Sequence, residues 1–168
     1  MKKTFFAIML MLASVVTLKA QSLTETAWLT NIPDEENAEM VLNFDDDGSC
    51  YIIFTKVEVD EENGMSIRVS MTVPGVYTRD DNMLDVNFNK EEASINIDYT
   101  MEGLDAHTKA MMDAMILPEL KKMEPEIKKN LLEAVPSGAM EIMMLTDVEL
   151  LLKIGDEKPI FFGRTAKG

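Results

Sequence analysis

The sequence predicts a mainly β protein built from antiparallel strands, with a helical insert before the last three strands. Three observations indicate this fold class. Apolar and polar residues alternate along most of the chain, which is typical of strands with one buried face. Short clusters of Gly, Pro, Asn and Asp separate the alternating runs. Between residues 104 and 135, apolar residues instead recur every three or four positions, which is the period of a one-sided helix.

Residues 1–20 predict an export signal. A basic start precedes an apolar run over residues 5–18, and the small residue Ala20 follows it. Because this run is short for a membrane span, we expect cleavage after Ala20 rather than a retained anchor. The chain should then be exported, periplasmic or secreted, and not an integral membrane protein. Residues 21–168 are long enough for one ordinary domain.

The chain is acidic, with a net charge of −14 that becomes −17 if the three lysines of the signal are removed. Such a surface repels nucleic acid and anionic lipid headgroups, so we exclude both as partners. The helical insert is nearly neutral, so the strands carry most of the charge. Its lysines are expected on the face away from the apolar stripe, where simple solvation is favoured over a docking surface.

The N-terminal part predicts three strands, over residues 23–32, 40–44 and 49–59. A hairpin at Asp45-Asp46-Asp47-Gly48 joins the second strand to the third. Glu61-Glu62-Asn63-Gly64 is the strongest hairpin signal in the chain, because Asn-Gly suits the left-handed positions of a tight turn.

Residues 65–101 show the clearest alternation and predict an antiparallel meander of three strands. Met65, Ile67, Val69, Met71 and Val73 share one face of the first of these strands. Pro-Gly after this run is expected to bend the chain, and polar clusters reverse it twice more.

The insert over residues 104–135 predicts two or three short helices. Asp105 is a plausible N-cap. Pro118 suits the first turn of a second helix, and Pro125 predicts a further break or kink. The following run, residues 139–146, is apolar on both faces, which suggests that the helices cover it. Two more strands should follow, over residues 148–154 and 159–165.

Candidate catalytic residues are few. The only His, His107, has no Ser or Cys nucleophile motif beside it, so we expect no enzymatic activity. The only Cys, Cys50, cannot form an internal disulfide. Successive residues of a strand point to opposite faces. If Tyr51 and Ile53 point inward, Cys50 therefore lies on the outer face or at a strand end. An inert thiol is favoured over a functional one there, because the neighbouring charges are acidic.

Two patterns in the sequence could form metal sites, but each also has a structural explanation. Asp45-Asp46-Asp47-Gly48 loosely resembles a calcium loop, but its Gly comes too early and no bidentate Glu follows, so a hairpin is favoured. The chain is rich in methionine, and seven Met lie between residues 111 and 144. Met112 and Met115 would share a helical face and could bind Cu(I), although Met more often fills a deformable apolar lid. We expect no metal and no cofactor.

Several segments together resemble the lipocalin-like (calycin-type) domains of small secreted bacterial proteins. These segments are Trp28, Gly75-Val76-Tyr77, Asp81-Asn82-Met83-Leu84, Leu150-Leu151-Leu152-Lys153 and Pro159-Ile160-Phe161-Phe162-Gly163-Arg164. The resemblance implies an antiparallel up-and-down β-barrel of about eight to ten strands. It also implies that Trp28 packs beside Arg164 to close one end of the barrel. This chain has Thr26 where the family usually has Gly, two residues before the Trp.

A barrel of this size either holds one small ligand or is filled by its own side chains. The inward-facing set is apolar, so we expect a non-enzymatic binder of a small lipophilic molecule in the barrel interior, beneath a methionine-lined lid. The alternative is a solid-cored structural or protein-interaction module of the cell envelope. The residues expected to line the interior and the lid are Phe44, Ile67, Val69, Met71, Phe88, Ile97, Tyr99, Met111 and Met115.

Overall fold

The computed structural model describes residues 22–33, 35–136 and 138–167. The predicted signal over residues 1–20 therefore lies outside the described residues. In the described part, nine antiparallel strands, one short 3₁₀ helix and one α-helix are formed. Their bounds are β1 Thr26–Asn31, β2 Ala38–Phe44, β3 Ser49–Asp60, β4 Met65–Asp80, β5 Met83–Phe88, η1 Lys90–Glu92, β6 Ser94–Met101, α2 Ala106–Glu133, β7 Gly138–Leu145, β8 Glu149–Ile154 and β9 Ile160–Thr165.

Eight of these strands close an antiparallel barrel. Each pairs with the next in the order β1-β2-β3-β4-β5-β7-β8-β9, and β9 pairs back onto β1. β6 lies outside the ring and pairs with β4. The prediction of a mainly β chain forming a closed antiparallel barrel is thus confirmed, and closure protects the edges of these eight strands.

The long strand β4 explains why β6 lies outside. One edge of β4 pairs with β3 over twelve residues, from Met65 to Val76. Its other edge pairs with β6 over residues 65–72 and with β5 over residues 75–80. The meander prediction was therefore wrong in its order, because β5 and β6 share the edge of β4 and do not pair with each other. Val73 and Pro74 lie between the two pairings, Gly75 begins the pairing with β5, and a Cβ on Gly75 would come within 2.7 Å of the Asn87 carbonyl oxygen.

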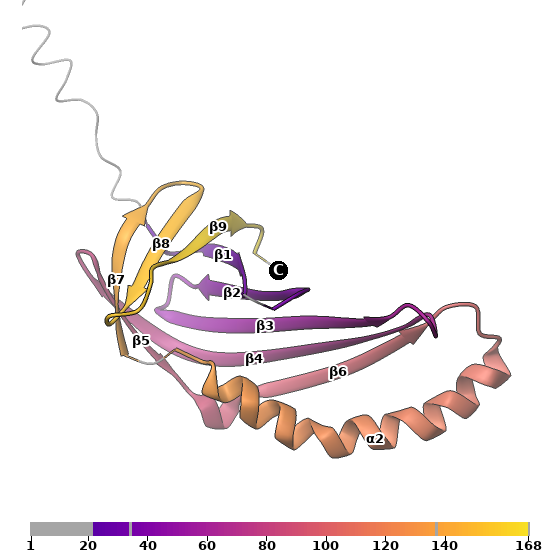
Figure 1. The fold of residues 1–168 in the computed structure, drawn as a ribbon. Helices are drawn as coiled ribbons and strands as arrows, with labels where there is room; N and C mark the ends of the chain where they lie inside the picture. The colour runs from indigo at the N-terminus through magenta and orange to yellow at the C-terminus, as the bar shows by residue number, and fades with distance from the viewer. Residues whose placement is uncertain (1–21, 34, 137, 168) are drawn as a thin grey trace, which may run out of the picture.

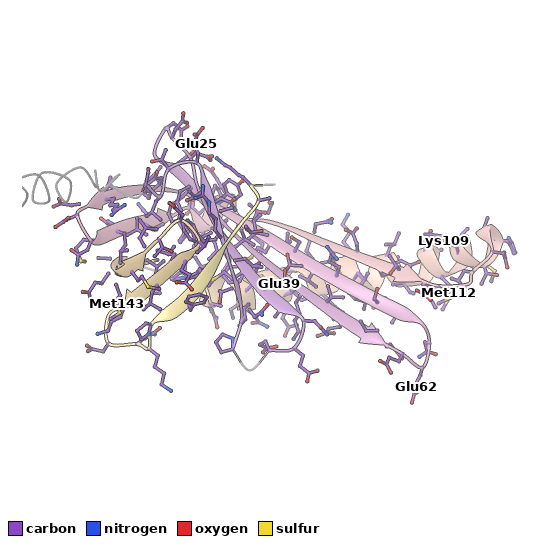
Figure 2. All side chains as sticks on the ribbon, turned by 90° about the horizontal axis from the view of Figure 1, so that it is seen from above. Glu25, Glu39, Glu62, Lys109, Met112 and Met143 are labelled. Carbon is purple, nitrogen blue, oxygen red and sulfur yellow. The ribbon has the colours of Figure 1, made fainter. Side chains whose placement is uncertain are left out.

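Together β3, β4 and β6 extend beyond the barrel as an outer sheet, and α2 runs back beside them (Figure 1). In Figure 2, Lys109 and Met112 of α2 lie at the far end of this extension, with Glu62 of the β3–β4 hairpin near the tip, whereas Met143 lies at the barrel end. The helix therefore covers β6 and β4. The expectation that it covers residues 139–146 was wrong, and Met143 in that strand is exposed.

The insert is one 28-residue helix, and the prediction of two or three short helices was wrong. Asp105 is the N-cap as predicted, since its side chain accepts hydrogen bonds from the backbone N–H groups of His107 and Thr108. Pro118 and Pro125 both lie inside the helix. Proline removes a hydrogen bond and crowds the preceding turn, which bends a helix that tertiary contacts keep intact. Figure 1 shows α2 curving along the outer sheet.

The barrel interior is filled by its own side chains. Buried residues from all eight strands form one hydrophobic cluster, and Ile52, Met71, Val73, Leu84 and Leu150 have no exposed surface. Other members are Trp28, Met40, Leu42, Phe44, Cys50, Phe54, Val86, Phe88, Met140, Ile142, Leu152 and Phe162.

The parity expected for β3 was wrong. Cys50, Ile52 and Phe54 are buried, whereas Tyr51 and Ile53 are only partly buried. The error has a simple cause: β3 carries apolar residues on both faces, so alternation alone does not distinguish the inner face. Burial, followed by the negative charge of Asp45, raises the pKa of the Cys50 thiol to about 11. Cys50 is therefore a packing residue inside the barrel.

Candidate functional site

A groove lies between α2 and the outer sheet, and its floor follows from the strand register. Residues opposite one another in antiparallel strands share a face. One row across the floor is Lys56 on β3, Val69 on β4 and Ile97 on β6, and the next row begins with Glu58 and Ile67. The floor is therefore apolar along β4 and β6 and charged along β3. We call this site the α2 groove.

The roof comes from one stripe of α2. Leu120, Met123, Ile127 and Leu131 follow one another at spacings of three and four residues, so they point to one side of the helix. Leu120 is the one buried residue of α2. Met123 also lines the groove, but 53% of it is exposed, which places it at the rim.

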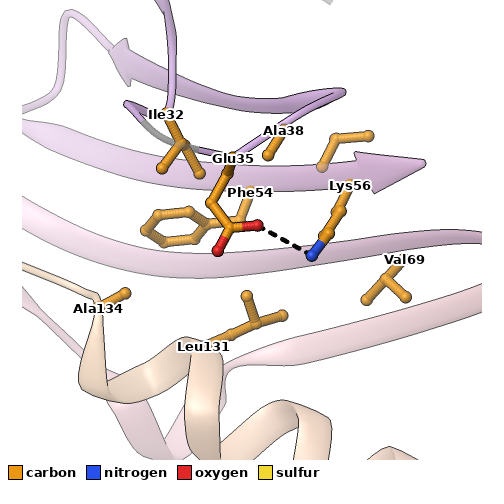
Figure 3. Close-up of a pocket in the computed structure, with 9 residues that line it drawn as sticks. Ile32, Glu35, Ala38, Phe54, Lys56, Val69, Leu131 and Ala134 are labelled. Carbon is orange, nitrogen blue, oxygen red and sulfur yellow. Dashed lines mark hydrogen bonds and ion pairs between the residues drawn. The ribbon is translucent and has the colours of Figure 1, made fainter. Parts of the chain in front are cut away.

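At its barrel end, the groove is lined by Ile32, Glu35 and Ala38 (Figure 3). Ile32 and Ala38 contribute apolar surface there, together with Phe54. Glu35 reaches the Lys56 ammonium at 2.9 Å, and Glu58 lies 3.5 Å from the same ammonium. The hydrogen bond from Lys56 to Glu35 raises the pKa of Lys56. Both partners of this ion pair are well exposed, so it contributes at most about 1 kcal/mol.

Two adjoining pockets make up the α2 groove. The first, of about 220 Å³, is bounded by Ile32, Phe54 and Leu131, and the second, of about 300 Å³, lies farther along the helix. Lys56, Val69 and Leu131 line both pockets, so the spaces meet at these residues. The second volume is at the lower end of the range of small-molecule sites, about 300–1,000 Å³, and the first is below that range.

A polar contact fixes the first half of α2 to the outer sheet beyond the pockets. The Tyr99 hydroxyl on β6 donates a hydrogen bond to Asp113 on α2, and the Lys109 ammonium lies 5.7 Å from the centre of the Tyr99 ring. Lys109 also contacts the Asp113 carboxylate at 3.0 Å. The hydrogen bond to Asp113 raises the pKa of Tyr99 to about 12, and the same bond lowers the pKa of Asp113.

The residues predicted to line the ligand site divide among three places. Phe44, Met71 and Phe88 lie in the filled barrel core. Ile67, Val69 and Ile97 line the α2 groove.

The other three lie toward the far part of the extension. Tyr99 contacts α2 as described, whereas Met111 and Met115 are 58% and 67% exposed and do not line either pocket. Three of the predicted sheet residues, Ile67, Val69 and Ile97, thus line the α2 groove, whereas the predicted helical residues, Met111 and Met115, do not. Leu120, Met123, Ile127 and Leu131 carry the apolar helical spacing and could have been chosen on that signal.

Trp28 and Arg164 are backbone partners across the β1–β9 pair that closes the barrel. Trp28 is buried, and its indole N–H donates to the Thr26 hydroxyl at 2.7 Å. The Thr26 hydroxyl in turn donates to the Leu23 carbonyl. The Arg164 guanidinium donates to the Asp147 carbonyl at 3.2 Å. Thr26 thus supplies the acceptor that a buried indole needs.

Other candidate residues have local structural roles. His107 is exposed at the start of α2, where Asp105 caps its backbone N–H. In the β2–β3 hairpin, Asp47 accepts hydrogen bonds from the Ser49 backbone and hydroxyl. Within the described ranges, no group of three His, Cys, Asp or Glu residues is arranged to hold a metal ion.

Comparison with known proteins found neither a family model nor a curated relative that matches this chain. Among the described residues, no helix combines the length and the apolar character needed to cross a membrane.

Proposed function

We propose that the protein is a non-enzymatic, exported binder of a small lipophilic molecule, built on a barrel of lipocalin-like type. The α2 groove is its binding site. One observation carries this proposal. Two adjoining pockets with a mostly apolar lining lie outside the filled barrel core, between α2 and the outer sheet, and Leu120 is the one helical residue buried there. Pockets of this kind, with a few polar groups at the edge, are the usual form of small-molecule sites.

The location differs from the interior site expected from sequence. Interior side chains pack together in the barrel, so Phe44, Met71 and Phe88 stabilise the scaffold rather than contact a ligand. The same face of β4 continues outward, past Met71, to Val69 and Ile67. A ligand would lie on this continuation, with Leu120 and Leu131 above it.

The alternative function is a protein-interaction module, and two observations favour it. β6 pairs with β4 along one edge, and the described part of the chain supplies no second strand for its other edge. Exposed apolar side chains at Met111, Met115 and Leu117 lie on the nearby helix. An unpaired strand edge beside apolar side chains can accept a strand from another protein.

Native mass spectrometry of the protein purified from its own host, followed by titration with decanol, tests the binding proposal. We expect a co-purified apolar molecule, or binding of decanol in its absence. Val69→Trp should abolish binding, because Val69 lines both pockets and the larger side chain would occupy the space where they meet. The spectra also give the mass of the chain, which we expect to begin at Gln21.

Val59→Trp is the matched control. Val59 lies on the outer sheet next to Glu58, so it points to the opposite face, and it is already exposed. It should retain full binding. Equal thermal stability of both variants would show that they fold. Binding by a folded Val69→Trp variant, or no binding by the unsubstituted protein, would contradict the proposal.

A further inference from the structure

The charged groups around the α2 groove are unevenly placed. On the sheet side, Lys56 stands between Glu35 and Glu58, so one cation meets two carboxylates. All three lie at the β3 margin of the floor, whereas β4 and β6 supply only apolar groups to the pockets. The polar part of a ligand would therefore lie at the β3 margin.

The helical rim of the groove carries charges of both signs. Met123 and Asn130 line the second pocket from α2, and Glu119 and Glu126 occupy the same helical stripe at spacings of three and four residues. Both glutamates are exposed, and Glu119 pairs with Lys122 at 2.6 Å. Among the charged residues that line the two pockets, two carboxylates, Glu35 and Glu58, therefore meet one ammonium group, that of Lys56. The excess negative charge at the mouth has the same sign as the net charge of −14 of the chain.

From this arrangement we infer that the ligand of the α2 groove is a lipophilic cation, with an apolar body on β4, β6 and α2 and an ammonium-type head at the β3 margin. The inference rests on the proposed binding function. Carboxylates around an apolar cleft attract cations and repel anions, and partly shielded charges at a cleft mouth act more strongly than fully hydrated ones. A carboxylate head on Lys56 would lie beside Glu35 and Glu58, which repel it, whereas an ammonium head can share their free oxygens.

Three probes with the same ten-carbon chain test the inference: decylamine, decanol and decanoate. At neutral pH their heads are positive, neutral and negative, so the apolar contribution is held constant. Isothermal titration below the micelle concentration of each probe should give the tightest binding for decylamine and the weakest for decanoate. Glu58→Gln should weaken decylamine binding about 2- to 5-fold, which is the range for an exposed charge pair, and leave decanol binding unchanged.

Glu157→Gln is the control for bulk charge, because it changes the net charge equally but lies in the turn before β9. If decanol binds at least as tightly as decylamine, or if decanoate binds tightest, the inference is wrong while the binding function stands. If Glu157→Gln weakens decylamine binding as much as Glu58→Gln does, the preference is a property of the whole surface and the inference is wrong. If none of the three probes binds, the proposed function itself fails.

Discussion

Leu120→Ala should loosen α2 without loosening the barrel. Leu120 is the buried residue of the helix, and most other α2 residues that face the sheet are only partly buried. Pro118 and Pro125 weaken the helix further, because proline inside a helix costs about 3 kcal/mol. The helix therefore depends on its contacts with the outer sheet for stability.

The expected cost is about 2 kcal/mol, at the lower end of the Leu→Ala range of about 2–5 kcal/mol. The lower end applies because Leu120 borders an open groove, where the neighbours can move and water can enter. A loss of about 2 kcal/mol raises the population of the undocked helix roughly 30-fold. Hydrogen exchange followed by mass spectrometry should show this increase in the amides of α2, while the amides of β1, β8 and β9 keep their rates.

Leu152→Ala provides the comparison. Leu152 is 1% exposed in the barrel core, so its truncation should speed exchange in the barrel and in α2 together, because global unfolding exposes both. If Leu120→Ala accelerates exchange in the barrel strands as much as in α2, the helix and the barrel unfold as one unit. The reasoning from burial would then be refuted.

Three further predictions concern single contacts. Thr26→Val should lower the free energy of unfolding by about 1–3 kcal/mol, because it leaves the buried Trp28 indole N–H without its acceptor. Thr26→Ser keeps a hydroxyl and should lower the free energy of unfolding by less. Urea denaturation of both variants measures these losses. Cys50 should react with a thiol reagent at pH 8 only after unfolding, because it is buried. Its folded pKa of about 11 lies above the ordinary value of 9.0, so its contribution to stability should be lost as the pH rises from 9 toward 11. Denaturation of the protein and of Cys50→Ala across this pH range measures that loss. Tyr99→Phe should raise the pKa of Asp113 toward its ordinary value, since the lost hydrogen bond is the main cause of its depression; an NMR titration that finds the Asp113 pKa unchanged would contradict the hydrogen bond.

Local sequence signals predicted the local features well. Asn63-Gly64 predicted the β3–β4 hairpin, where Gly64 has a positive φ of 59°, and Asp105 predicted the start of α2. Most strand positions were correct to within a few residues, because alternation and turn residues are encoded locally, but β4 continues through Pro74-Gly75 to Asp80, where a bend after Val73 was expected. The features that failed depend on tertiary structure. Pro118 and Pro125 break an isolated helix, but the outer sheet keeps α2 continuous.

The candidate site was predicted in part. Ile67, Val69 and Ile97 were chosen because they share the apolar face of their strands, and the structure places them in the α2 groove. The groove itself exists because β6 pairs with the first half of β4, and periodicity does not specify which strand a segment will pair with. Lys56 was not predicted as a site residue, because a Lys near the polar end of a strand is typical of a solvent-facing position.

Because β4 is long, its two halves have different structural roles. Its second half belongs to the barrel wall, whereas its first half supports β6 and the floor of the α2 groove. Substitutions at the groove can therefore alter what is bound while the barrel remains intact, and descendants of such a chain could acquire new specificities without first becoming more stable. The binding specificity of such a chain could therefore diversify because β4 is longer than the barrel requires.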